Sequence, residues 1–146
     1  MYYQRTLEGA VRRASRQFPV VLISGPRQVG KTTLLRHLGE PGRRYVTLDD
    51  LALRALAQSD PALFLDRFSP PLLIDEIQYA PNLLPYIKMA VDSRKKPGAF
   101  WLTGSQQFQM MKGVSESLAG RVAILNLLGF AARERDKRDA LSEPFL

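Results

Sequence analysis

The chain has 146 residues, a formal net charge of +7 and no cysteine. This length is that of one ordinary domain with a buried core, and the lack of cysteine excludes disulfides, thiolate catalysis and cysteine-ligated zinc. A single histidine, His37, cannot build a histidine-rich metal site, so metal binding must use oxygen ligands, which favours Mg²⁺.

The predicted elements alternate between helix and strand along the chain. Apolar residues at helical spacing predict an amphipathic first helix that Pro19 ends; they are Leu7, Val11, Ala14 and Phe18. Continuous apolar runs then predict five strands, at residues 20–24, 44–48, 72–75, 99–103 and 122–128. Helices are predicted at residues 31–38, 51–57, 61–68 and 81–92, and between Gly104 and Gly120.

This alternation implies right-handed βαβ crossovers and a parallel sheet covered on both faces, so the predicted fold class is α/β. We expect residues 1–130 to form the core domain, because the last predicted strand ends close to residue 130. Residues 131–146 are charged and only weakly periodic, which predicts a tail that is a helix, a linker or a frayed end.

A glycine-rich segment follows the first predicted strand and opens the next helix. It reads Gly25-Pro-Arg-Gln-Val-Gly30-Lys31-Thr32 and fits G-x-x-x-x-G-K-[ST] at every fixed position. The two glycines let the backbone turn with its N–H groups pointing inward, and the helix start adds its positive dipole end. Lys31 is expected to lie on the β- and γ-phosphates of ATP, and the Thr32 hydroxyl to bind Mg²⁺. The residues expected to bind the nucleotide are Gly25, Pro26, Arg27, Gln28, Val29, Gly30, Lys31, Thr32 and Thr33.

Two carboxylates, Asp75 and Glu76, end the third predicted strand, and ligands of open α/β sheets bind at that edge. Asp75 is expected to hold Mg²⁺ directly or through water. Glu76 faces a different direction and can polarise a water molecule for attack on the γ-phosphate, which favours hydrolysis over transfer to a substrate hydroxyl. Asp49 can also reach the magnesium shell, although capping of the following helix by Asp49 or Asp50 is the simpler explanation for these residues.

With these two motifs the chain resembles the AAA+ ATPases, and within them a prokaryotic branch. The Walker A loop of that branch reads G-P-R-Q-V-G-K-T and its Walker B strand reads L-I-D-E-I-Q; both stand here, at residues 25–32 and 73–78. The resemblance covers Tyr3 to Phe130 and implies a P-loop NTPase core, a three-layer αβα sandwich whose parallel five-stranded sheet has the order 5-1-4-3-2. Relatives continue into a C-terminal domain of unknown function, which implies that residues 131–146 are a linker or a truncated lid.

The resemblance also implies further catalytic residues beside Glu76. The segment T-G-S-Q matches the fourth-strand sensor of the γ-phosphate, with Thr103 and Ser105 as candidates, and Ser105 is favoured because the family pattern places the serine on the loop. Arg121 matches the usual place of an arginine finger, which would act on the nucleotide of a neighbouring subunit in a homo-oligomer.

Two functions follow from these features. The first is a Mg²⁺-dependent ATPase that couples hydrolysis of ATP to ADP and phosphate to conformational change in a partner domain or macromolecule. The second is a nucleic-acid-binding module with a regulatory or vestigial nucleotide site, motivated by the basic residues Arg12, Arg13, Arg16, Arg43, Arg44, Lys95 and Lys96.

Other classes are disfavoured. A kinase is disfavoured because no motif for a phosphate acceptor is visible, and a GTPase because no N-K-x-D segment follows the fourth predicted strand. No apolar run approaches the roughly 18 residues of a spanning helix, and the start lacks the apolar segment of a signal peptide. We therefore expect a cytoplasmic protein with no membrane partner.

Overall fold

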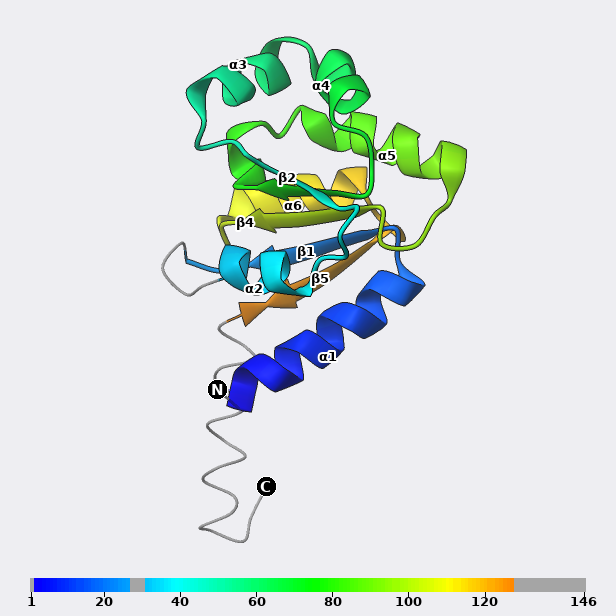
Figure 1. Ribbon diagram of the computed structural model, residues 1–146. Helices are drawn as coiled ribbons and strands as arrows, with labels where there is room; N and C mark the ends of the chain where they lie inside the picture. Colours follow the sequence, from blue (N-terminus) through cyan, green and yellow to red (C-terminus); the bar gives the residue numbers. More distant parts are fainter. Residues whose placement is uncertain (1, 27–30, 128–146) are drawn as a thin grey trace, which may run out of the picture.

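The computed structural model describes residues 2–26 and 31–127, which form a five-stranded sheet flanked by helices (Figure 1). The strands are β1 (Val20–Ser24), β2 (Arg44–Thr47), β3 (Leu72–Asp75), β4 (Phe100–Gly104) and β5 (Val122–Asn126). Their order is β2-β3-β4-β1-β5, and every neighbouring pair is parallel. This order confirms the predicted 5-1-4-3-2 sheet and the α/β class of the P-loop NTPase core.

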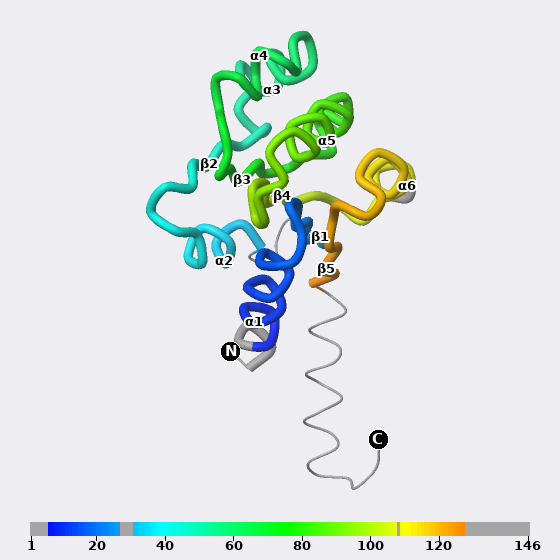
Figure 2. Tube along the Cα trace, turned by 90° about the vertical axis from the view of Figure 1, so that its right-hand side faces the viewer, coloured from blue at the N-terminus to red at the C-terminus, as the bar shows by residue number. Residues whose placement is uncertain are grey.

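The helices form a layer on each face of the sheet. Figure 2 shows α1 (Tyr2–Gln17) and α2 (Lys31–Leu38) on one side of the strands. The other side carries α3 (Leu51–Ser59), α4 (Pro61–Arg67), α5 (Leu83–Arg94) and α6 (Phe108–Ser117). A short 3-10 helix, η2 (Ile77–Tyr79), follows β3. None of the helices in the described ranges has the length and apolar character needed to cross a membrane.

Each face of the sheet has its own apolar core, because successive side chains of a strand point to opposite faces. In β1, Val21 and Ile23 belong to the cluster formed with α1 and α2, whereas Val20 and Leu22 belong to the cluster formed with α3 to α6. All five residues of β1 are buried, which explains why this strand is a continuous apolar run rather than an alternating pattern.

Both ends of one predicted helix depart from the sequence prediction for local reasons. The helix predicted at residues 81–92 begins later, at Leu83, because the residues before it form a turn in which the Leu83 N–H bonds to the Ala80 carbonyl. It also ends later, at Arg94, where Lys95 takes a left-handed conformation with a φ of 55° and donates its N–H to Val91. A non-glycine residue in this conformation gives no sequence signal, because glycine is the usual residue at such a helix end.

Arg43, just before β2, is a buried cation. Its side chain is 4% exposed, and its guanidinium lies 4.0 Å from the centre of the Trp101 ring. It donates hydrogen bonds to the Glu40 carboxylate at 2.7 Å and to the carbonyls of Gly98 at 2.6 Å and Leu72 at 3.3 Å. Burial lowers the pKa of Arg43, and the Glu40 carboxylate opposes that shift. The expectation that Arg43 contributes to a basic surface is therefore wrong, because its charge is used inside the fold.

Candidate functional site

Three buried charged side chains meet at the carboxyl edge of the sheet. Lys31, the first residue of α2, is 2% exposed, Asp75 at the end of β3 is 5% exposed, and Glu76 is 3% exposed. The Lys31 ammonium lies 3.8 Å from a carboxylate oxygen of Glu76. Charged groups are rarely buried unless they are paired or bind a ligand, so this cluster is the strongest functional candidate in the described part of the chain.

Four hydroxyl groups surround the Asp75 carboxylate. One of its oxygens accepts hydrogen bonds from Thr32 and Thr103, each at 2.5 Å. The other oxygen accepts from Thr47 at 3.0 Å and from Tyr45 at 3.3 Å. Burial raises the pKa of the Tyr45 hydroxyl, and the nearby Asp75 charge raises it further, so Tyr45 stays a donor. The hydroxyls hold the carboxylate in one orientation at the strand end.

Sequence reasoning missed Tyr45 and Thr47. Both lie on β2, which pairs with β3 in a register that places Thr47 directly beside Asp75. The signal was available in principle, because the expected strand order already placed the second strand next to the third. The strand order alone does not show that these two side chains reach Asp75. That also depends on the register, because a shift by one residue would turn both side chains to the other face of the sheet.

Glu76 takes an unusual backbone conformation with a φ of 61°. Its N–H donates to the Thr103 hydroxyl at 2.9 Å, and the same hydroxyl donates to Asp75. A left-handed non-glycine residue costs about 1–3 kcal/mol and persists only where its surroundings hold it, often at functional sites. This turn ends the alternation of the strand, and carboxylate oxygens of Glu76 and Asp75 lie within 4.8 Å of each other.

Asp49 joins the same cluster. Its carboxylate lies within 4.8 Å of those of Asp75 and Glu76. Asp50, not Asp49, caps α3, because the Asp50 side chain accepts the N–H groups of Ala52 and Leu53. The interpretation of Asp49 as a helix cap is therefore wrong, and its place near the other carboxylates needs a different reason.

The charges of this cluster suit a divalent cation. Three carboxylates, of Asp49, Asp75 and Glu76, stand against the ammonium of Lys31, so these four side chains have a formal charge of −2. The Thr32 hydroxyl adds a neutral oxygen beside Asp75. An all-oxygen, net-negative set of this kind fits Mg²⁺, which binds through carboxylates together with phosphate and water oxygens.

The two sensor candidates lie at the end of β4 but have different surroundings. Thr103 is fully buried and bonds to Asp75 and to the Glu76 backbone. Ser105 lies just beyond the strand, where its backbone N–H donates to the Gln78 side chain at 3.3 Å. Within the described ranges its hydroxyl oxygen is buried and has no hydrogen-bond partner. Such an orphaned polar atom is costly unless a ligand satisfies it, which fits a phosphate oxygen at this position.

The segment predicted to bind phosphate, residues 25–32, is described only at its two ends. Gly25 is buried and donates its N–H to the Gly104 carbonyl at 3.1 Å, and Pro26 is exposed. Lys31 and Thr32 reach the cluster described above, whereas Thr33 is exposed on α2. Four residues that sequence analysis assigned to nucleotide binding lie outside the described residues: Arg27, Gln28, Val29 and Gly30.

Arg121 lies at the opposite edge of the sheet. Its carbonyl accepts the N–H of Val20, the first residue of β1, whereas the predicted phosphate-binding loop follows the last residue of that strand. Five strand residues span roughly 13 Å or more, so Arg121 does not reach the site of its own chain. Its guanidinium instead forms a two-point pair with Asp92, at 2.5 and 3.0 Å.

This pair predicts a pH effect on stability. The hydrogen bond from Arg121 holds the pKa of Asp92 below its ordinary value of 3.8. A carboxylate whose pKa is lower in the folded than in the unfolded chain stabilises the fold above the unfolded pKa, and this contribution disappears as the pH falls through the folded pKa. In urea titrations Asp92→Asn should therefore be less stable than wild type at pH 6, and the difference should disappear as the pH falls below the unfolded value of 3.8 and through the lower folded pKa. Parallel titration curves for the two proteins would contradict this role of the pair.

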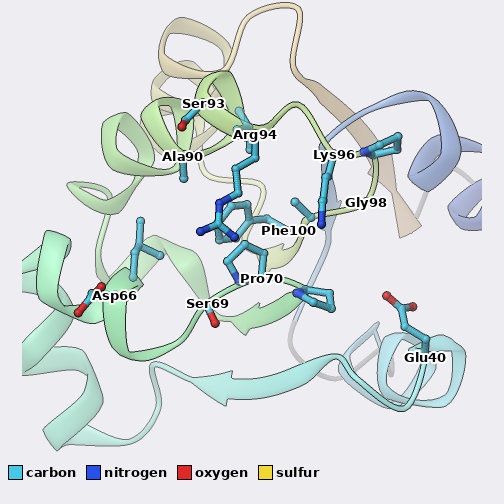
Figure 3. Close-up of a pocket in the computed structure, with 15 residues that line it drawn as sticks. Glu40, Asp66, Ser69, Pro70, Ala90, Ser93, Arg94, Lys96, Gly98 and Phe100 are labelled. Atoms are coloured by element: carbon cyan, nitrogen blue, oxygen red, sulfur yellow. The ribbon is translucent and has the colours of Figure 1, made fainter.

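A cavity of about 490 Å³ lies away from the cluster, where β3 and β4 begin (Figure 3). Its lining includes Phe100 of β4, and the side chains of Arg94 and Lys96 point into it. The cavity is at the amino edge of the sheet, whereas Lys31 and Asp75 are at the carboxyl edge. It therefore takes no part in the site.

Comparisons with known proteins agree with this geometry. The model of a family described as "AAA domain" matches residues 17–135. Similar proteins include an uncharacterised protein of Mycobacterium bovis and an uncharacterised protein of Mycobacterium tuberculosis, each 37% identical to this chain over 131 residues. The matched stretch covers 90% of this chain but 30% of each relative, so the chain spans about a third of the length of the relatives it matches.

Proposed function

From the premise that this chain belongs to the AAA domain family, we propose that it is a Mg²⁺-dependent ATPase core. Membership of this family supports nucleotide binding, and the hydrolytic role is our proposal. The observation that carries it is the burial of Lys31 together with Asp75 and Glu76 at the head of α2. A lysine at that place serves phosphate binding, and a carboxylate beside it serves the activation of water.

The metal would be held by Thr32 and Asp75, with Asp49 close enough to contribute through water. A cation held by these residues would supply positive charge that offsets the negative charge developing on the phosphates. Thr47 and Tyr45 keep the Asp75 carboxylate oriented by donating to its second oxygen. Their role is to position Asp75 as a metal ligand, because a carboxylate already held by two donors does not have to be ordered when the cation binds.

Hydrolysis requires a base, and Glu76 is the best placed candidate. The Lys31 ammonium lies 3.8 Å from the Glu76 carboxylate, and a triphosphate would compete with Glu76 for it. The carboxylate would then be available to accept a hydrogen bond from a water molecule. The water oxygen then bonds to the γ-phosphorus, its proton passes to Glu76, and the bond from phosphorus to the β–γ bridging oxygen breaks to release ADP. Ser105 would offer its hydroxyl to the γ-phosphate.

The direct test is release of phosphate from ATP by the purified chain, with and without Mg²⁺. Hydrolysis should need Mg²⁺, and Lys31→Ala should weaken ATP binding by about 10–100-fold, because a charge-assisted contact is worth about 1.5–3 kcal/mol. Lys112→Ala is the matched control, since Lys112 is exposed on α6 and pairs only loosely with Glu116, at 3.9 Å. ATP binding that is equal in Lys31→Ala and wild type would refute the assignment.

The use of the released energy is a further part of the proposal. The relatives are about three times as long as the matched stretch, so this core would act on a partner domain or macromolecule through conformational change. Arg121 faces away from its own site, so a catalytic role for it would require the nucleotide of another copy in a homo-oligomer. The homo-oligomer and the arginine-finger role of Arg121 stay predictions.

Fewer basic residues are available for nucleic-acid binding than the sequence indicated. Arg12, Arg13 and Arg16 are exposed on α1, and Lys95 and Lys96 are exposed after α5. Arg43 is buried, and the Arg44 guanidinium donates to the Arg67 carbonyl at 3.0 Å. The remaining basic groups lie on separate elements, so we retain ATP hydrolysis as the proposed function.

A further inference from the structure

The side chain of Gln78 bridges two parts of the candidate site. Its Nε2 donates to a carboxylate oxygen of Glu76 at 3.2 Å, and its Oε1 accepts the backbone N–H of Ser105 at 3.3 Å. Gln78 lies in η2, directly after the turn at Glu76, whereas Ser105 begins the loop between β4 and α6. One carboxamide therefore links the candidate base to the loop that carries the candidate γ-phosphate sensor.

The orientation of this carboxamide follows from its partners. The Ser105 N–H can only donate, so it must face Oε1, and the Glu76 carboxylate can only accept, so it must face Nε2. The reversed carboxamide would place donor against donor and acceptor against acceptor. Neither a carboxylate nor an apolar side chain of the same length can replace both contacts, so the site requires an amide at position 78.

The packing around the bridge leaves little freedom for the loop. Gly104 precedes Ser105, and a Cβ added there would come within 2.5 Å of Met110 Cε and 3.4 Å of Gln78 Oε1. The Gly104 carbonyl also accepts the N–H of Gly25, the first residue of the phosphate-binding loop. The loop after β4 is thus joined on one side to the start of the phosphate-binding loop and on the other side, through Gln78, to Glu76.

We propose that Gln78 is a positioning residue for ATP hydrolysis: its carboxamide fixes the Glu76 carboxylate relative to the sensor loop, residues 105–107. The Glu76 carboxylate lies between two donors, the Lys31 ammonium at 3.8 Å and the Gln78 amide at 3.2 Å. When phosphates bind the Lys31 ammonium, the Gln78 amide keeps the Glu76 carboxylate in place. The position of that amide depends in turn on where the loop holds Ser105. The loop that contacts the γ-phosphate therefore also aligns the base, Glu76, with that phosphate.

This inference rests on the proposed function and predicts a selective loss of kcat. Gln78→Met keeps the length of the side chain and removes both hydrogen bonds, and Gln78→Glu removes the donor to Glu76 and adds a like charge. Each should lower kcat by about 10–100-fold, since a misplacement of about 1 Å at a reacting group costs on the order of 10²-fold. The Kd for a fluorescent ATP analogue and the melting temperature of Gln78→Met should stay close to wild type, because the Gln78 side chain is only half-buried and bonds to Glu76 and to the Ser105 backbone rather than to Lys31 or Thr32.

Gln109→Met is the matched control, because Gln109 is exposed on the neighbouring helix α6. A double-mutant cycle with Glu76→Asp supplies the readout that a merely structural residue would not change. Gln78→Met should lose far less kcat in the Glu76→Asp background than in wild type, because the shorter carboxylate is already out of reach of the amide.

Equal losses in the two backgrounds, or wild-type kcat in Gln78→Met, would overturn the role of Gln78. A parallel loss of ATP binding and melting temperature would overturn it too, since Gln78 would then be a folding residue. Absence of Mg²⁺-dependent hydrolysis in the wild-type chain would instead overturn the proposed function, and the role of Gln78 with it.

Discussion

Glu76→Gln is expected to lower kcat for ATP hydrolysis by about 10³-fold while ATP binding is retained. A positioned general base contributes about 10²–10⁴-fold, and glutamine keeps the shape of the side chain but cannot take a proton. Binding should be unchanged or tighter, because the carboxylate that lies 3.8 Å from the Lys31 ammonium would no longer compete with the phosphates. The measurements are single-turnover phosphate release and equilibrium binding of a fluorescent ATP analogue, each in the presence of Mg²⁺.

Glu116→Gln serves as the control for this substitution. Its side chain is 67% exposed on α6, so removing its charge should leave both kcat and binding at wild-type values. Turnover by Glu76→Gln at the wild-type rate would remove Glu76 from the role of base. In that case the burial of Glu76 beside Lys31 would serve folding alone.

The second large effect concerns stability and the buried Arg43. Arg43→Met is expected to lower the free energy of unfolding by about 3 kcal/mol, because breaking a buried charged network leaves its partners unsatisfied. The Gly98 carbonyl would lose its 2.6 Å donor, and the Trp101 ring would lose the guanidinium 4.0 Å above it. Urea denaturation should show the loss, and thermal melting should show a decrease of about 10 °C for a chain of this size.

Two companion variants separate charge from geometry. Arg43→Lys should recover only a small part of the loss, because an ammonium cannot reproduce the planar fork that reaches Glu40 and two carbonyls together. Arg12→Met, on the exposed face of α1, should change the free energy of unfolding by less than about 0.5 kcal/mol. A wild-type midpoint for Arg43→Met would show that the buried guanidinium contributes nothing net.

The strands were predicted well because their signal is local. The runs at residues 20–24 and 72–75 match β1 and β3, since both strands are buried on both faces and are apolar throughout. Lys95 shows the opposite case, because its left-handed conformation ends α5 without the glycine that usually marks such a position. The choice between Asp49 and Asp50 also stayed open, because either residue could cap a helix beginning at Leu51 and only the structure shows which side chain turns back to it.

The sequence by itself predicted a phosphate-binding loop before α2 and placed two carboxylates at the end of a buried strand. These features are local, since they depend on residues adjacent in the chain. Only the tertiary structure decided which side chains meet there. Asp75 contacts Thr32 and Thr103, which are 43 and 28 positions away, and such contacts depend on strand order, on register and on the backbone turn at Glu76. A one-residue slip in register would separate these groups while leaving every local pattern intact. For this reason the hydroxyl shell of Asp75, the place of Asp49 and the bridge through Gln78 could be found only in the folded chain.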